Sequence, residues 1–376
     1  MINNSSWRSR SFAAVAALAS VSMLAACGSN DSGTPKTSSA NAGPVVAGES
    51  QPGAFKGARL TFVSYGGQYQ KGQEAALADF AKTTGAQVVG DGPALLSKLQ
   101  AQVQAKNVSW DIFDTDGTTA SVNCGTIFMK LDFSKIDVSK APKGSYGDCY
   151  VPAMKLDEML VYDTDKFGSN PPTSWKDFFD TKNFPGKRAM LGIPGAGYGQ
   201  IIAALLADGV APKDLYPIDF DRAFKKLDSI KSDIVFADTG AKAQQLMESG
   251  EVTMSYTWSG RGMNSEINGA HVAGVWNQAI EMGDALAIPI GVKDPDAAMA
   301  ALNSYLGKKQ QETMTEMTSY SPVNVDAEPK LSEVAQKWVT TTPERTAAGI
   351  APDWTYWSKP DIYKKAADMW NAWISQ

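Results

Sequence analysis

The feature that most constrains the fold is a repeated alternation of strand-like and helix-like segments that begins near residue 59. Short runs rich in β-branched and aromatic residues alternate with longer segments in which apolar residues recur every three or four positions. The first block predicts strands over 59–65, 87–89 and 110–114, and helices over 68–83 and 93–103. This order is typical of an α/β fold, in which helices cover both faces of a mostly parallel sheet.

A second block of the same kind follows the segment that contains Cys124 and Cys149. It predicts strands over 159–162, 187–193, 234–236, 252–256, 272–275 and 285–290, and helices over 175–179, 200–208, 220–227, 241–248, 295–306, 310–317 and in the tail 331–376. Two α/β blocks of comparable size predict two lobes. Ligands of such sheets bind beyond the carboxyl ends of the strands. The candidate site therefore lies at the loops after Val63, Phe113, Ile193, Tyr256 and Val275.

The N-terminus has the features of an export signal. Arg8 and Arg10 precede an apolar run over 12–26, which is too short for a comfortable membrane span and ends in small residues. The sequence Leu-Ala-Ala-Cys that ends at Cys27 resembles a bacterial lipobox. This resemblance implies cleavage before Cys27 and attachment of diacylglycerol to its sulfur. The alternative is an ordinary signal with an incidental cysteine.

We therefore predict a lipoprotein signal peptide over 1–26 and a lipidated cysteine with a flexible tether over 27–57. The tether is rich in Gly, Ser, Thr, Pro and Ala, and such a stretch buries too little apolar surface to fold. The predicted location is extracytoplasmic and membrane-anchored, either in a periplasm or on the outer face of the cell membrane.

Two cysteines remain in the body, Cys124 and Cys149. Outside the cytoplasm an even pair predicts a disulfide. A nucleophilic thiol is the alternative, but it needs an activating neighbour, and the single histidine, His271, is distant in sequence. One histidine also leaves little room for a zinc site or a Ser-His triad. We therefore expect no metal, no cofactor and no enzymatic activity. The net charge of −5 argues against a nucleic-acid partner.

Several segments resemble the spermidine/putrescine-type solute-binding proteins of ABC importers (family 1-like). They are Ser64–Tyr69, Trp110–Asp114, Pro172–Asp180, Phe184–Arg188, Trp258–Arg261, Gly283–Pro289, Asp296–Met299 and Tyr320–Asn324. The resemblance covers about residues 58–340. It implies a two-lobed clamshell of type II, with crossover strands at the hinge. The expected lobes are 58–160 plus 287–320 and 161–286 plus 321–376.

The resemblance also implies roles for single residues. In this family an aspartate just before the Leu-Ala-Ile-Pro strand binds the ligand amine, and Asp284 matches it. A tryptophan in the Trp-x-Gly segment packs on the ligand, which here is Trp258, and the first loop supplies an aromatic, Tyr65 or Tyr69. A carboxylate in a cleft favours a cation, and an indole face attracts one. An exposed strand-end aspartate and a core tryptophan are the alternatives.

Two further positions bear on which amine is bound. Arg261 resembles the arginine of family members that bind γ-aminobutyrate-like zwitterions, and a guanidinium fits a carboxylate with two hydrogen bonds. An interlobe ion pair or a solvated charge is the alternative. Polyamine binders often have an aromatic residue just before the aspartate, where this chain has Met282. That departure weakens the case for a long polyamine.

The remaining candidate ligand residues are Tyr198, Ser64, Asp116 and Asp157. Tyr198 lies in a glycine-rich turn that begins a helix, where free N–H groups favour an anion. Ser64 belongs to the first loop, and Asp116 follows the third strand in a segment that lacks the rest of a calcium loop. Either Asp157 or Glu158 can add a carboxylate before the crossover strand, although an ordinary surface role is the alternative.

The predicted function is that of a lipid-anchored substrate-binding protein of an ABC importer. It captures a small amine-bearing solute, either an ω-amino acid such as γ-aminobutyrate or putrescine or spermidine, and delivers it to a membrane permease. We expect it to act as a monomer. One alternative is an extracytoplasmic enzyme of the same fold with a cysteine nucleophile. An iron-type carrier is disfavoured because no adjacent tyrosine pair occurs.

Overall fold

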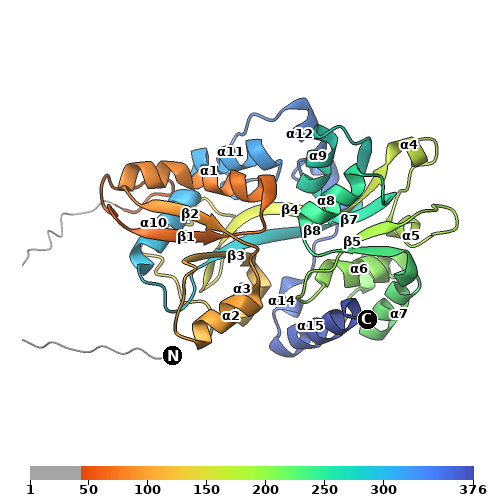
Figure 1. The fold of residues 1–376 in the computed structure, drawn as a ribbon, viewed down its shortest axis with the longest axis horizontal. Coiled ribbons are helices and arrows are strands. Elements are labelled where there is room, and N and C mark those ends of the chain that lie inside the picture. The colour runs from red at the N-terminus through yellow and green to blue at the C-terminus, as the bar shows by residue number, and fades with distance from the viewer. Residues whose placement is uncertain (1–43) are drawn as a thin grey trace, which may run out of the picture. The chain divides into compact units, whose positions relative to one another are not determined.

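An eight-stranded sheet runs through the computed structural model, which describes residues 44–376 (Figure 1). The predicted signal peptide, Cys27 and the tether up to residue 43 lie outside the described residues. The prediction of a flexible tether was wrong for residues 44–57, because Gly48 and Phe55 donate backbone hydrogen bonds to Asn303 and Thr84 and Phe55 packs against the core. The strands are β1 (Arg59–Val63), β2 (Gln87–Asp91), β3 (Ile112–Asp116), β4 (Tyr150–Asp163), β5 (Arg188–Leu191), β6 (Ile234–Ala237), β7 (Met254–Trp258) and β8 (Val272–Ala287). Their order across the sheet is β2-β1-β3-β8-β4-β7-β5-β6.

The two ends of the sheet are parallel and the middle is antiparallel. Strand β1 pairs in parallel with β2 and β3, and β5 pairs in parallel with β6 and β7. Between these groups run β4, of 14 residues, and β8, of 16 residues, each antiparallel to its neighbours. The predicted α/β fold, with a mostly parallel sheet in each half and crossover strands between them, is confirmed.

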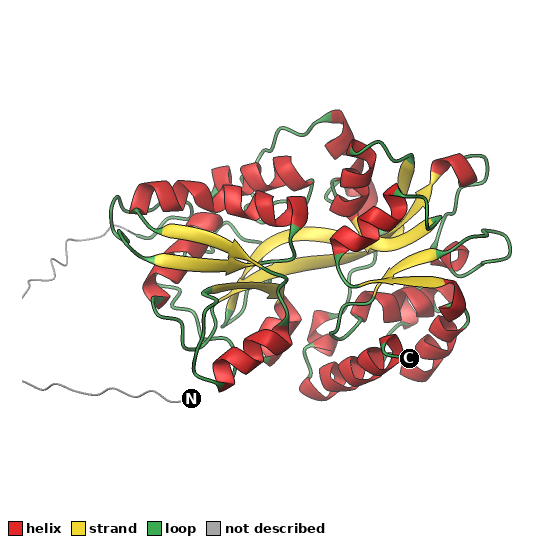
Figure 2. Cartoon of the chain, viewed as in Figure 1, coloured by secondary structure: helices red, strands yellow, loops and turns green. Residues whose placement is uncertain are grey.

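Helices lie on both sides of the strands in each half (Figure 2). They are α1 (Gly67–Thr84), α2 (Leu96–Gln104), α3 (Gly117–Val122), α4 (Thr164–Phe167), α5 (Trp175–Phe178), α6 (Tyr198–Ala207), η1 (Pro212–Asp214), α7 (Phe220–Asp228), η2 (Lys231–Asp233), α8 (Gly240–Glu248), α9 (Ser259–Ile267), α10 (Pro295–Tyr305), α11 (Lys308–Thr318), α12 (Glu333–Trp338), α13 (Pro343–Ala348), α14 (Trp354–Trp357) and α15 (Pro360–Ile374). Polar caps fix several starts, as where the Asp116 and Asp294 carboxylates accept the N–H groups of Thr119 and Ala297.

The predictions were wrong where the chain crosses between the halves. The strands expected over 272–275 and 285–290 are one strand, β8, and the strand expected over 159–162 is only the end of β4. Much of β8 is half-buried, so its apolar pattern has no single period. The tail is also four helices rather than one, because Pro343 and Pro360 each begin a new helix.

Buried apolar side chains form a large cluster around β5, β7 and α6 and separate clusters around β1, β3 and α10. The tryptophans Trp338, Trp357, Trp370 and Trp373 all belong to the first cluster. They are core residues, as their helical spacing indicated. The residue boundaries of the two predicted lobes stay a prediction.

Cys124 and Cys149 form a disulfide with Cα atoms 5.6 Å apart, as predicted. The bond closes the loop that leads from α3 into β4. It also leaves no free thiol in the described part of the chain, which removes the support for a cysteine nucleophile there. None of the helices between residues 44 and 376 combines the length and hydropathy needed to cross a bilayer.

The disulfide should stabilise the fold mainly by restricting the unfolded chain. For a separation of 25 residues we expect a loss of about 3 kcal/mol in the free energy of unfolding when both cysteines are replaced by serine. Urea unfolding of the oxidised protein and of the C124S/C149S variant measures this loss. Equal stability of the two proteins would contradict it.

Candidate solute-binding site

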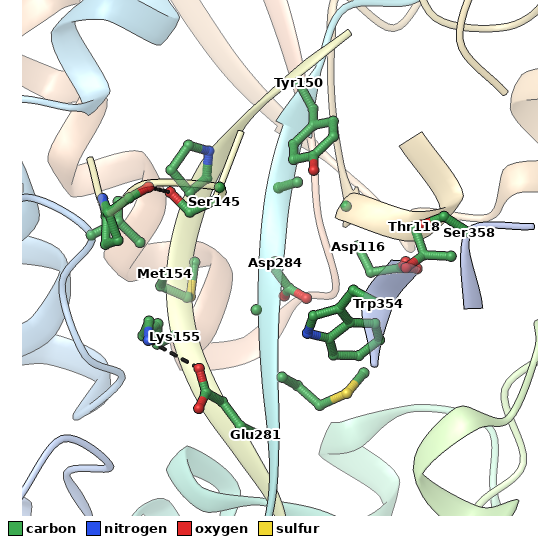
Figure 3. A pocket seen from close by; sticks show the side chains of 18 of the residues that line it. Asp116, Thr118, Ser145, Tyr150, Met154, Lys155, Glu281, Asp284, Trp354 and Ser358 are labelled. Atoms are coloured by element: carbon green, nitrogen blue, oxygen red, sulfur yellow. Dashed lines mark hydrogen bonds and ion pairs between the residues drawn. The ribbon is translucent and has the colours of Figure 1, made fainter. Parts of the chain in front are cut away.

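Two adjoining cavities lie where the carboxyl ends of the parallel strands meet the middle of β8. Their volumes are about 450 Å³ and about 260 Å³, and they share the side chains of Asp116, Met282 and Asp284. Figure 3 shows the smaller one, in which Asp284 projects from β8 toward the side where Asp116 and Trp354 lie. The sequence predicted Asp116, Met282 and Asp284 as candidate ligand residues, and the structure brings them together.

Asp284 is the most strongly perturbed carboxyl group at the cavity. It lies opposite Asp116 in the β3–β8 ladder and accepts a hydrogen bond from the Tyr69 hydroxyl. Burial raises the pKa of Asp284 well above its ordinary value, and the charges of Asp114, Asp116 and Glu158 raise it further. The part of the chain that the structure describes supplies no cation to this carboxylate.

Asp114 lies behind the cavity wall rather than in it. The group is fully buried and accepts hydrogen bonds from Ser64 Oγ at 2.8 Å and Gln73 Nε2 at 2.9 Å, while its Oδ1 atom has no partner. Burial raises the pKa of Asp114 to about 7. Ser64, predicted as a ligand residue, is also fully buried here and holds Asp114 instead of facing either cavity.

Aromatic rings form one wall of the larger cavity. Tyr65, in the loop after β1, and Trp258, at the end of β7, both line it, with ring centroids 6.0 Å apart. Tyr69 extends this group, because its ring lies 6.3 Å from Tyr65 and 5.3 Å from Tyr320. The ring faces of this wall carry a negative electrostatic potential that attracts a cation. Their apolar surface can also contact a methylene chain.

Arg261 lies beside this aromatic wall but does not line either cavity. Arg261 belongs to α9, and only 2% of the residue is exposed. Its Nη2 donates to the carbonyl oxygen of Gly66 at 3.3 Å, its Nε has no partner, and no described carboxylate pairs with it. A Cβ at Gly67 would lie 2.7 Å from Nη1, and one at Gly240 would lie 2.7 Å from Nε. Arg261 is therefore packed tightly against two glycines, with most of its donors unused.

The register of β4 separates Asp157 from Glu158. Successive residues of a strand face opposite sides of the sheet, and Glu158 lines the larger cavity whereas Asp157 lies outside both. Burial raises the pKa of Asp157 to about 7, an effect that Glu281 increases and that Lys155 and Arg345 oppose. Of the two carboxylates considered from the sequence, the structure thus brings Glu158 into the cavity.

Glu158 is a residue that sequence reasoning considered but did not select. Its carboxylate accepts hydrogen bonds from the Tyr256 hydroxyl and from Trp258 Nε1, the latter at 3.3 Å. Burial raises the pKa of Glu158 to about 7 although both of these bonds oppose the shift. Only the strand register shows whether Asp157 or Glu158 faces the cavity. The strand was expected to begin at residue 159, so the sequence analysis assigned no register to either residue.

Tyr198, a candidate from its glycine-rich turn, lines the larger cavity, and its hydroxyl has no partner among the described residues. Thr119 and Tyr363 also line it, with their hydroxyl oxygens 3.3 Å apart, and neither was predicted. Tyr363 belongs to α15, and no sequence motif linked that helix to the site. Within residues 44–376, no three His, Cys, Asp or Glu side chains are placed to hold a metal ion.

Comparison with known proteins shows the family to which the chain belongs. The family model for bacterial extracellular solute-binding proteins matches residues 75–347. The γ-aminobutyric acid-binding protein of Pseudomonas aeruginosa is 29% identical over 326 residues, covering 84% of this chain and 91% of its own length. The spermidine/putrescine-binding periplasmic protein 1 of Haemophilus influenzae is 23% identical over 271 residues, or 69% of this chain and 74% of that protein.

A solved structure of a GABA receptor is also similar, with 37% identity and a TM-score of 0.73 over 84% of this chain and 97% of the other. The chain therefore belongs to the bacterial extracellular solute-binding proteins. Members of this family act outside the cytoplasm, and the resemblance drawn from the sequence motifs is confirmed.

The buried carboxyl groups should make the empty protein less stable at higher pH. Asp114 and Glu158 have pKa values of about 7 in the folded protein, against about 4 in an unfolded chain. Their protonation therefore stabilises the fold fully below about pH 4, and this contribution is lost as the pH rises through 7. Calorimetry without ligand should show the melting temperature falling by several degrees between pH 5 and pH 8.

The Asp114→Asn variant is the control for this effect, because it keeps the shape but cannot ionise. Its melting temperature should fall less over the same range. A melting temperature of the unmodified protein that stays level or rises between pH 5 and pH 8 would contradict the assignment.

Proposed function

We propose that this protein is the substrate-binding component of an ABC importer and that its solute is a small amine, in first place an ω-amino acid such as γ-aminobutyrate. The observation that carries this proposal is a pair of incompletely neutralised charges. Asp284 has no cation and Arg261 has no anion among the described residues, although the two flank the same aromatic wall. A zwitterion supplies both missing charges.

The chemistry of each end supports this assignment. A carboxylate that is removed from water loses much of its solvation, so Asp284 gains strongly from an ammonium group. Trp258 presents a face to the same cation or to its methylene chain. The carboxylate of the solute would take the place of the Gly66 carbonyl at Arg261, where a charged acceptor gives shorter and stronger hydrogen bonds. The γ-aminobutyric acid-binding relative is consistent with such a ligand.

A second candidate solute is a diamine. Three carboxyl groups, those of Asp116, Glu158 and Asp284, line the larger cavity, and no lysine or arginine is among its lining residues. This excess of negative charge favours a dication. The spermidine/putrescine-binding relative supports the same class.

The remaining parts of the proposal concern delivery. We infer that the lobes 58–160 plus 287–320 and 161–286 plus 321–376 close on the solute and that the closed monomer docks on the permease. We also infer that the protein is not an enzyme, since the relatives named above are binding proteins. The lipid on Cys27 would hold the protein at the membrane through the segment that links Cys27 to the body.

Binding should depend on both charged ends. Replacing Asp284 by Asn, or Arg261 by Met, should weaken γ-aminobutyrate binding by at least about 30-fold, because truncating one partner of a desolvated charge pair costs about 2–5 kcal/mol. Isothermal titration calorimetry measures this. No heat from γ-aminobutyrate, putrescine or spermidine with the unmodified protein would remove the amine assignment.

The anchor has a separate test. In cells that express the full chain, the protein should partition into detergent and incorporate labelled fatty acid, because acyl chains add apolar surface that favours the membrane. The Cys27→Ser variant should do neither. Equal labelling of both proteins would show that Cys27 is not the lipidated residue.

A further inference from the structure

We propose that Glu158 forms a second cation subsite in the larger cavity, so that the protein takes α,ω-diamines as well as ω-amino acids. In both cases one ammonium group lies at Asp284. This inference rests on the proposed function, because it takes Asp284 as the first amine subsite. Glu158 would then be the residue that distinguishes diamines from ω-amino acids.

The first observation is that Glu158 is buried and hydrogen-bonded but has no counterion. Only 6% of the residue is exposed, and its two partners, the Tyr256 hydroxyl and the Trp258 indole N–H, are both neutral donors. No lysine, arginine or histidine of the described chain pairs with it. Two neutral hydrogen bonds orient a carboxylate but leave its charge uncompensated in a poorly solvated place.

The second observation is a free hydroxyl group in the same wall. Tyr198 is 6% exposed, lines the larger cavity, and has an Oη atom without a hydrogen-bond partner. The next residue, Gly199, packs directly on Glu158, since a Cβ there would collide with the Glu158 carboxylate and the Tyr256 hydroxyl. An ammonium group has three N–H donors, and the Glu158 carboxylate is an acceptor for them.

The third observation is the path between the two carboxylates. In the β4–β8 ladder Asp284 lies opposite Met154, Met282 opposite Leu156, and Ile280 opposite Glu158. Paired residues of antiparallel strands share a face, and so do residues two apart along a strand. Asp284 and Glu158 therefore stand on one face of the sheet.

Leu156 and Met282 lie between these two carboxylates and also line the larger cavity. They make an apolar floor of the kind that a methylene chain contacts. Met282, which lacks the aromatic ring that many polyamine binders have at this position, gives this floor a flexible, polarisable side chain instead.

The backbone spacing is of the same order as the length of a short diamine. Four residues separate Asp284 from Ile280, the partner of Glu158, which is about 13 Å of strand. An extended four-carbon diamine places its nitrogens about 6 Å apart at ordinary bond lengths. A hydrogen bond of about 2.8 Å at each end brings the span between carboxylate oxygens to about 12 Å.

The two solute classes would then share Asp284 and differ at the other end. An ω-amino acid directs its carboxylate to Arg261, and a diamine directs its second ammonium to Glu158. Removing one of the two distal residues should therefore change the preference between the ligands in opposite directions.

Isothermal titration with γ-aminobutyrate and with putrescine tests the proposal. The measured quantity is the ratio of the putrescine Kd to the γ-aminobutyrate Kd. Glu158→Gln, which keeps the shape and the acceptor oxygen, should raise this ratio at least about tenfold, and Arg261→Met should lower it by a similar factor. The matched control is Asp157→Asn, which removes a carboxylate one residue away on the opposite face and should change the ratio less than about twofold.

A measurement on the unmodified protein does not depend on the folding of any variant. Butylamine, which lacks the second nitrogen, should bind at least about tenfold more weakly than putrescine. Equal affinities, or a Glu158→Gln ratio like that of the unmodified protein, would overturn the second subsite. Binding of γ-aminobutyrate without any binding of putrescine would overturn it too, while leaving the proposed function intact. Absence of binding by every amine would instead remove the proposed function itself.

Discussion

The pairing of β4 with β8 is the interaction on which the rest of the structure depends. These long strands are antiparallel to each other and to their outer neighbours, so they join two parallel groups into one sheet. They also carry the site, because Glu158 belongs to β4, and Met282 and Asp284 belong to β8. The same backbone ladder that connects the halves therefore sets the spacing of the candidate ligand groups at the cavity.

The site is built from acidic groups that repel one another. Asp114, Asp116, Glu158 and Asp284 act on one another electrostatically, and neutral donors such as Tyr69 and Tyr256 satisfy them only in part. Such an arrangement is costly for an isolated protein. A positively charged solute would offset that cost. The acidic cleft therefore lowers the stability of the empty protein but favours the binding of a cation.

The alternation of strands and helices could be predicted from the sequence because each outer element keeps one pattern of apolar and polar positions along its length. Burial changes along the two middle strands, so their apolar pattern is irregular. The prediction therefore divided β8 in two and missed the start of β4. This error decided the choice between Asp157 and Glu158, since only the register shows which one faces the cavity. The local motif pointed to Trp258, which the structure places at the larger cavity, but no local pattern could show that Arg261 packs against Gly66 and Gly67, which are distant in sequence.

The raised pKa values of the cavity carboxyls have a consequence for transport. Near neutral pH, the Glu158 carboxyl in the cavity wall is divided between its protonated and ionised forms in the empty protein. An arriving ammonium group favours the ionised form, so capture expels protons and the total charge of the cleft changes little. Under the proposed function, cargo and protons would compete for the Glu158 oxygen atoms, and the acidity of the surroundings would regulate loading.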